Sequence, residues 1–175
     1  MKKNIFSILS LMLLLFAASS CEKDEVGGTA TEATAGDWYC TMAAVDENGE
    51  SVDDDWFGLG FHHVITFNTA ANVATEMWLS DEGVNEDYFP YKLKINVNPE
   101  AGTFQAEAAA NEFDENKVTV YGGKVVKNGT KTPSGIPADY IEFFISFDND
   151  EFPSTYGFKC YKVTGYRYSG FVADE

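Results

Sequence analysis

Basic residues are scarce in this chain of 175 residues. Lys and Arg number 12 against 28 Asp and Glu, which gives a formal net charge of −16 at pH 7. An acidic surface repels a phosphate backbone, so we predict no nucleic-acid partner. Cysteine is also rare, and three residues exclude a small fold held together by several disulfides. Aromatic residues, in contrast, make up 15% of the chain, which favours a folded core over a disordered chain.

The usual catalytic motifs are missing as well. The chain has no Gly-x-Ser-x-Gly and no His-Glu-x-x-His motif. Its two histidines, His62 and His63, are adjacent, so on a strand they face opposite sides and at most one reaches an interior site. The acidic clusters at residues 46–55 and 148–151 lack EF-hand spacing and are interpreted as solvated loops. We therefore predict no catalytic residues, no metal and no cofactor, and a chain that favours a non-enzymatic role.

One long apolar run exists, at residues 5–18 behind Lys2 and Lys3. It is shorter than the roughly 20 residues that span a bilayer, and it ends in small residues. This pattern predicts a secretory signal peptide over residues 1–20. The small residues directly before Cys21 resemble a lipobox, in which the cysteine is lipidated. An ordinary cleaved signal followed by a chance cysteine is the alternative.

Residues 21–35 are predicted to be the lipidated cysteine and a flexible tether, since they are rich in Gly, Thr, Ala and Glu and show no periodicity. Two acyl chains on Cys21 would attach the protein to a membrane, which its acidic surface does not do. Residues 22–25 resemble the export signal of Bacteroidetes surface lipoproteins. We therefore expect a lipid-anchored outer-membrane protein exposed at the cell surface, with the periplasmic face as the alternative.

The remaining chain, residues 36–175, has the patterns of one antiparallel β domain. Residues 91–98 alternate apolar and polar without a break, which is typical of a strand with one wet face. No segment sustains a helical apolar period. Eight strands are predicted, at residues 38–45, 61–68, 74–79, 91–98, 103–108, 117–126, 141–147 and 158–171. They favour an all-β, eight-stranded antiparallel barrel, whose closure removes free edges, over a β-sandwich.

Two further cysteines lie in the first and last predicted strands. Cys40 and Cys160 would come from neighbouring strands of a closed barrel, and export permits a disulfide. Such a bridge would close a long loop and contribute on the order of 4–5 kcal/mol in the entropic model. Two buried thiols that behave as small apolar groups are the alternative.

The ends of the domain carry a resemblance. Gly36-Asp37-Trp38 is similar to the Gly-x-Trp that begins lipocalin-type barrels, and residues 165–171 end the last predicted strand. In lipocalins a basic residue of that strand covers the tryptophan, so the resemblance implies that Arg167 lies over Trp38 and closes the barrel. A cation over an indole contributes roughly 0.5–2 kcal/mol.

Together with the acidic lipoprotein-like start and residues 77–81 and 123–125, these motifs resemble the family of lipid-binding putative hydrolases of Bacteroidetes lipoproteins. Tyr168-Ser169 departs from the expected second basic residue and Thr. The resemblance implies a calycin-like barrel with an apolar cavity. The family description includes the word hydrolase, but the sequence shows no set of residues that would catalyse hydrolysis.

Three functions follow as hypotheses. The first is a binding module for a lipid or another small apolar ligand in the barrel, where eight strands leave room for one small molecule. The second is a filled barrel whose surface aromatics bind a surface lipoprotein or a glycan. The third, a hydrolase, comes from the family description alone. The residues predicted to line the ligand cavity are Phe61, Ile65, Phe67, Trp78, Phe104, Phe143 and Phe147.

Overall fold

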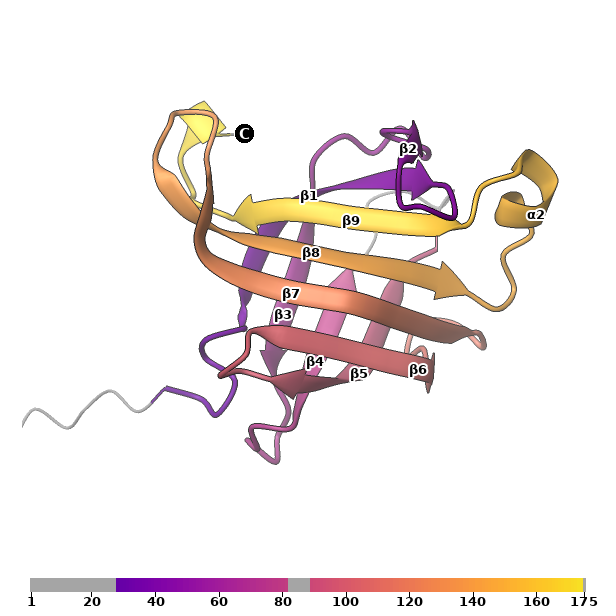
Figure 1. Ribbon diagram of the computed structural model, residues 1–175. Helices are drawn as coiled ribbons and strands as arrows, with labels where there is room; N and C mark the ends of the chain where they lie inside the picture. Colours follow the sequence, from indigo (N-terminus) through magenta and orange to yellow (C-terminus); the bar gives the residue numbers. More distant parts are fainter. Residues whose placement is uncertain (1–27, 82–88, 175) are drawn as a thin grey trace, which may run out of the picture.

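The computed structural model describes residues 28–81 and 89–174. Their strands form one antiparallel sheet that closes because β1 (Gly36–Val45) pairs with β9 (Cys160–Arg167) (Figure 1). In sheet order the strands between them are β3 (His62–Asn68), β4 (Glu76–Asp81), β5 (Tyr91–Asn98), β6 (Thr103–Ala110), β7 (Lys117–Lys131) and β8 (Pro137–Phe147). The predicted eight-stranded barrel is thus confirmed, and the β-sandwich alternative is wrong because the sheet closes on itself.

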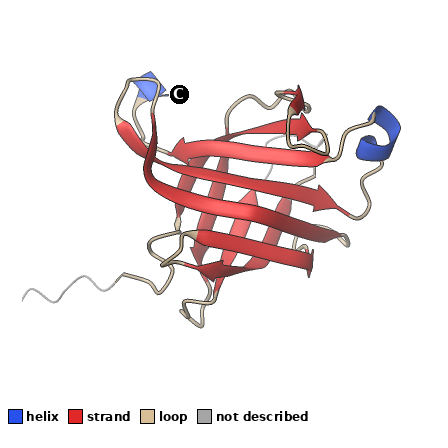
Figure 2. Cartoon of the chain, viewed as in Figure 1, coloured by secondary structure: helices blue, strands red, loops and turns tan. Residues whose placement is uncertain are grey.

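The barrel has two different ends (Figures 1 and 2). At one end, here called the α2 end, the short strand β2 (Ser51–Asp53) pairs with the last residues of β1, and helix α2 (Phe152–Tyr156) leads into β9. At the other, here called the Trp38 end, β1 begins and β9 finishes, followed by the 3-10 helix η1 (Val172–Asp174). No helix in the described residues is long and apolar enough to cross a membrane.

The period-two pattern builds the core directly. Along β5 the side chains of Tyr91, Leu93, Ile95 and Val97 are buried, while the alternate residues are half-buried or exposed. The inward residues of the other strands extend this core around the barrel. The alternation read from residues 91–98 is therefore the alternation between lumen and outer wall.

Three features differ from the sequence-based expectation. Strand β2 lies in a segment expected to be a loop, and so does α2, which Pro153 begins and Gly157, with φ of 80°, ends. Part of the segment expected to be a tether also packs on the barrel, since Thr31 and Thr34 are fully buried. The folded unit therefore starts before Gly36. Cys21 lies outside the described residues.

Candidate functional site

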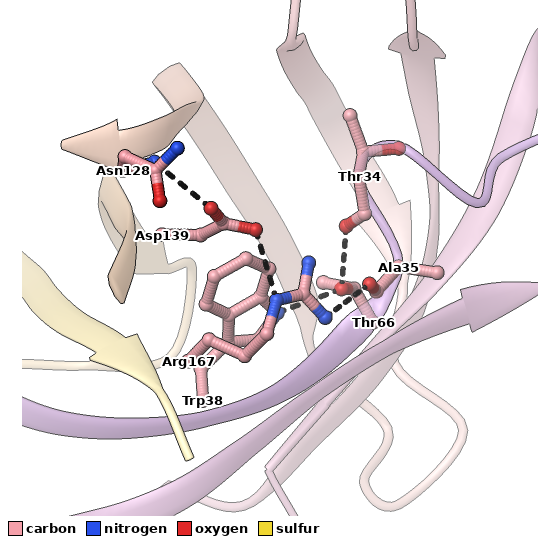
Figure 3. A network of polar contacts seen from close by, with 7 residues as sticks. All are labelled: Thr34, Ala35, Trp38, Thr66, Asn128, Asp139 and Arg167. Carbon is pink, nitrogen blue, oxygen red and sulfur yellow. Dashed lines mark hydrogen bonds and ion pairs between the residues drawn. The ribbon is translucent and has the colours of Figure 1, made fainter. Parts of the chain in front are cut away.

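The Trp38 end is closed by a polar network (Figure 3). Arg167 lies over the Trp38 indole, with its Cζ 4.5 Å from the ring centroid, and its Nε donates to Asp139 Oδ2 at 3.0 Å. The guanidinium Nη1 also donates to the Ala35 carbonyl at 2.9 Å. On the other side of the ring system, Trp38 Nε1 donates to Thr66 Oγ1 at 2.8 Å. This is the geometry that the lipocalin-type resemblance implies, and it joins both chain ends of the barrel.

A surface hollow of about 700 Å³ adjoins this end. It lies between the N-terminal turn, the turn that joins β5 to β6, and β7, and it is lined by five charged side chains and six apolar or small residues. The charged residues are Glu32, Glu100, Lys127, Asp139 and Arg167. An acyl chain bound here would take water away from these charged groups, which is unfavourable.

The middle of the barrel is filled by side chains. Leu93, Ile141 and Phe143 have no exposed surface at all, so no space large enough for a water molecule adjoins them. The interior around these residues is therefore packed, and an apolar ligand needs to enter where the packing is looser.

The α2 end is covered by aromatic rings. The rings come from the connection between β2 and β3, from the residues just before β5, and from the connection between β8 and β9. Here called the aromatic end cluster, they are Trp56, Phe57, Phe89, Phe152, Tyr156 and Phe158. Trp56, Phe57 and Phe89 are half-buried, Phe158 is buried, and Phe152 and Tyr156 are exposed. This end is thus closed by side chains carried on connections, whereas ionic and hydrogen-bonded groups close the other.

The aromatic end cluster rests directly on the core. Phe89 stacks on Phe147 with ring centroids 4.9 Å apart, and Phe57 packs on Tyr161 at 5.2 Å. Phe147 and Tyr161 point into the lumen from β8 and β9 and are 6% and 0% exposed. A continuous apolar path therefore leads from the half-buried rings into the barrel.

A buried contact between a histidine and an aspartate lies in the lumen near the same end. His62 begins β3 and Asp81 ends β4, and His62 Nε2 lies 3.2 Å from Asp81 Oδ2 with both side chains at most 2% exposed. The other ring nitrogen, Nδ1, lies 3.4 Å from the Gly60 carbonyl. His63, the neighbour of His62, is on the outer wall, where its Nδ1 lies 2.8 Å from Asp37 Oδ1. The expectation that the two histidines face opposite sides is confirmed.

Residues 23–172 match the protein-family model described as "Lipid-binding putative hydrolase". The chain belongs to this family. No curated protein matches it. The family and the barrel agree with a lipid-binding module.

A hydrolase that works through a covalent intermediate needs a nucleophile on the protein, and the described residues around His62 do not supply one. Cys40 is its register partner on β1, but burial and then the negative charges of Asp81 and Asp37 raise the pKa of the Cys40 thiol well above its usual value. A protonated thiol is a poor nucleophile. In residues 28–81 and 89–174, no serine hydroxyl hydrogen-bonds to either histidine and no group of three His, Cys, Asp or Glu side chains is placed to hold a metal.

Of the two alternatives for Cys40 and Cys160, the structure has the pair of buried thiols and not the disulfide. Cys40 and Cys160 are both free and buried. In the β1–β9 ladder Cys40 is opposite Gly165, five residues along β9 from Cys160, which is about 17 Å at the usual strand rise. Cys160 also points to the outer wall, where its Sγ lies 3.0 Å from Tyr121 Oη. The strands are neighbours, as expected, but the two cysteines are out of register and on opposite faces.

The predicted ligand-lining residues divide into two groups. Phe104, Phe143 and Phe147 point into the lumen, and their contact with a ligand stays a prediction. The other four lie on the outer wall, so for them the prediction is wrong: Phe61, Ile65, Phe67 and Trp78.

The error on β3 is a shift of one residue. Val64 and Thr66 are the buried, inward residues, and Thr66 proves the direction because it bonds Trp38 inside the barrel. A strand that carries apolar groups on both faces gives no unambiguous register from its pattern, and a one-residue change exchanges the faces. The same exchange places Trp78 outside, between the buried Met77 and Leu79. The aromatic end cluster was missed, although the aromatic density around residues 56–57 and 152–158 was a usable signal.

Proposed function

We propose that this protein is a lipid-binding module that takes the acyl chain of its ligand into the α2 end of the barrel. The observation that carries the proposal is the aromatic end cluster, which covers the lumen with rings from three separate connections. Membership of a lipid-binding family supports the ligand class. The barrel provides the scaffold, because a small antiparallel barrel accommodates a single small ligand.

Ring contacts of this kind are weak enough to be exchanged. Each aromatic pair contributes about 0.5–1.5 kcal/mol beyond its area burial, and an acyl chain that replaces a ring restores most of the apolar contact. Phe152, for example, touches Trp56, Phe57, Phe89 and Tyr156 at centroid distances of 6.1–6.3 Å, and it is carried on a single-turn helix. Displacing it breaks no strand pairing.

The experiment is photolabelling of the chain from residue 22 onward, which contains the whole barrel, with a diazirine-bearing fatty acid. We expect label on the peptides that carry Trp56–Phe57 and residues 152–158. Label concentrated in the hollow at the Trp38 end, or on the outer wall, would contradict the proposed entry.

A matched pair of variants tests the same site by measuring ligand affinity. Phe57→Ser should weaken cis-parinaric acid binding about tenfold or more, since removal of a buried ring from an apolar contact costs roughly 1.5–3 kcal/mol. Phe144→Ser is the control, because Phe144 stacks on Tyr121 on the outer wall, with ring centroids 5.1 Å apart. Equal loss in both variants would point to unfolding, which far-UV circular dichroism detects.

We further propose that the protein is anchored in the outer membrane through acyl chains on Cys21 and exposed at the cell surface. The signal-like residues 1–20, the small residues before Cys21 and the residues that follow it support this. Cys21→Ala in the full chain should move the protein out of the detergent-soluble membrane fraction. Unchanged membrane association of that variant would contradict lipidation.

A further inference from the structure

Strands β3, β4 and β5 lie across the barrel from β7–β9 (Figure 1). The outer wall of these three strands carries aromatic rings and lysines together. Here called the outer-wall patch, it consists of Phe67, Trp78, Lys92, Lys94 and Phe113. Lys92 Nζ lies 5.8 Å from the Phe67 ring, 5.6 Å from the Trp78 ring and 5.9 Å from the Phe113 ring. Lys94 Nζ lies 5.4 Å from the Trp78 ring. The two ammonium groups thus sit over a platform of three rings.

The charge of the patch is not neutralised locally. Lys124, Lys159 and Lys162 each form an ion pair with a glutamate, whereas Lys92 and Lys94 form none among the described residues. Lys117, Lys127 and Lys131 form no ion pair among the described residues either, so the rings beneath Lys92 and Lys94 are what distinguishes this surface. Phe113 is 43% exposed, and Phe67 and Trp78 are half-buried. Aromatic rings and lysines in this combination fit the boundary of a bilayer, where rings occupy the headgroup layer and ammonium groups meet lipid phosphates.

The patch is also continuous with the α2 end. Asn111 Oδ1 accepts the Lys92 and Phe113 amides, and Asn111 Nδ2 donates to the Pro90 carbonyl at 2.9 Å. Pro90 directly follows Phe89 of the aromatic end cluster. The connection that carries Phe113 is therefore fastened to the segment that enters the ligand-binding end.

We propose that the outer-wall patch docks the barrel on a phospholipid surface and so presents the aromatic end cluster to the lipid it takes up. The reason for docking rests on the proposed lipid-binding function. The docking itself depends on the residues of the outer-wall patch and not on the aromatic end cluster. Lysines engage lipid phosphates, Trp78 and Phe113 enter the headgroup layer, and the acidic remainder of the surface turns away from the membrane.

The test is sedimentation of the chain from residue 22 onward with sucrose-loaded vesicles of phosphatidylethanolamine and phosphatidylglycerol. Lys92→Glu/Lys94→Glu should lower the partition coefficient about tenfold or more, because each basic residue near such a surface is worth about a factor of five. Lys127→Glu/Lys131→Glu is the matched control, with the same change of charge on two β7 lysines outside the patch. It should lower the coefficient by less than about twofold, and Trp78→Ala should lower it without any change of charge.

Several outcomes overturn the proposal. One is a wild-type chain that does not sediment with vesicles, and another is an equal loss in the two double variants, which would show a response to total charge. A change of oligomeric state in Lys92→Glu/Lys94→Glu, seen by size-exclusion chromatography, would assign the patch to a protein partner instead. Binding of cis-parinaric acid in solution separates the two proposals: the patch variants should retain it, and its absence in the wild type would contradict the lipid-binding function alone.

Discussion

The two ends of this barrel are closed by different physical means. At the Trp38 end, charge, hydrogen bonds and an indole face meet in one network that joins Arg167 to Ala35, 132 positions apart in the chain. At the α2 end, rings on connections pack on one another and on side chains of the lumen. The connection between β8 and β9 also has hydrogen bonds, from Lys117 N to Asp148 Oδ1 and from Tyr161 Oη to Asp150 Oδ2, but the contacts among the rings themselves are apolar.

This difference indicates which end of the barrel tolerates substitution. Polar networks with several partners are costly to break in part, because each remaining group loses its hydrogen bonds. Apolar ring contacts are non-directional, so one ring is exchanged for another apolar group at small cost. The end that we expect to fix the fold and the end that we propose to admit a ligand are therefore separate, and substitutions at each should have different consequences.

The largest effect should come from Trp38→Ala. Trp38 is 0% exposed and contacts both Arg167 and Thr66, so its loss leaves a cavity and removes the ring under Arg167 and the donor that bonds Thr66 Oγ1. We expect the free energy of unfolding to fall by about 3–5 kcal/mol, measured by urea denaturation. A loss below about 1 kcal/mol would show that the Trp38 end does not fix the barrel.

Arg167→Ala should come next. The variant keeps the indole but loses the cation above it, the pairing with Asp139 and the hydrogen bond to Ala35. Because the side chain is partly exposed and its ion pair is screened, we expect a loss of about 1–2 kcal/mol in the same denaturation experiment. Arg167→Lys, which retains the charge, should recover part of it, and an unchanged midpoint for Arg167→Ala would contradict the role of the network.

The strands were predictable because their signals are local, and closure of the barrel was inferred from them because it removes the free edges of the sheet. Residues 91–98 place four apolar residues on one face of one strand, and the turn residues on either side fix its length. The pairing of Arg167 with Trp38 depends on contacts between distant parts of the chain, and the resemblance to lipocalin-type ends supplied it.

The ligand-lining residues on β3 were mispredicted for a physical reason. The inward face of β3 carries His62 and Thr66, which are polar yet buried because Asp81 and Trp38 satisfy them. Apolarity alone favours the opposite face with Phe61 and Phe67. Only the partners on neighbouring strands distinguish the faces, and a single sequence does not identify partners.

Asp174 offers a smaller, pH-dependent way to loosen the Trp38 end. Hydrogen bonds from Ser169 and then from Ser134 lower the pKa of the Asp174 carboxyl from 3.8 to about 2. Since the folded pKa is lowered, this stabilisation is present above about pH 4 and is lost as the pH falls towards 2. Asp174→Asn should therefore be less stable than the wild type at pH 7, by less than Arg167→Ala, and the difference should shrink at pH 2–3. An equal difference at both pH values would contradict the ionic origin.

The smallest effect on stability should come from Phe152→Ala at the α2 end. Phe152 is 37% exposed and lies on a single-turn helix outside the sheet, so we expect a loss of about 1 kcal/mol or less. Hydrogen exchange should nevertheless quicken in the connection that carries Trp56 and Phe57, because Phe152 packs on both rings, and remain unchanged at the start of β1. Exchange that quickens equally at both ends would show that the barrel opens as one unit. A local response would show that the aromatic end opens while Trp38 and Arg167 hold the other end closed, as ligand entry requires.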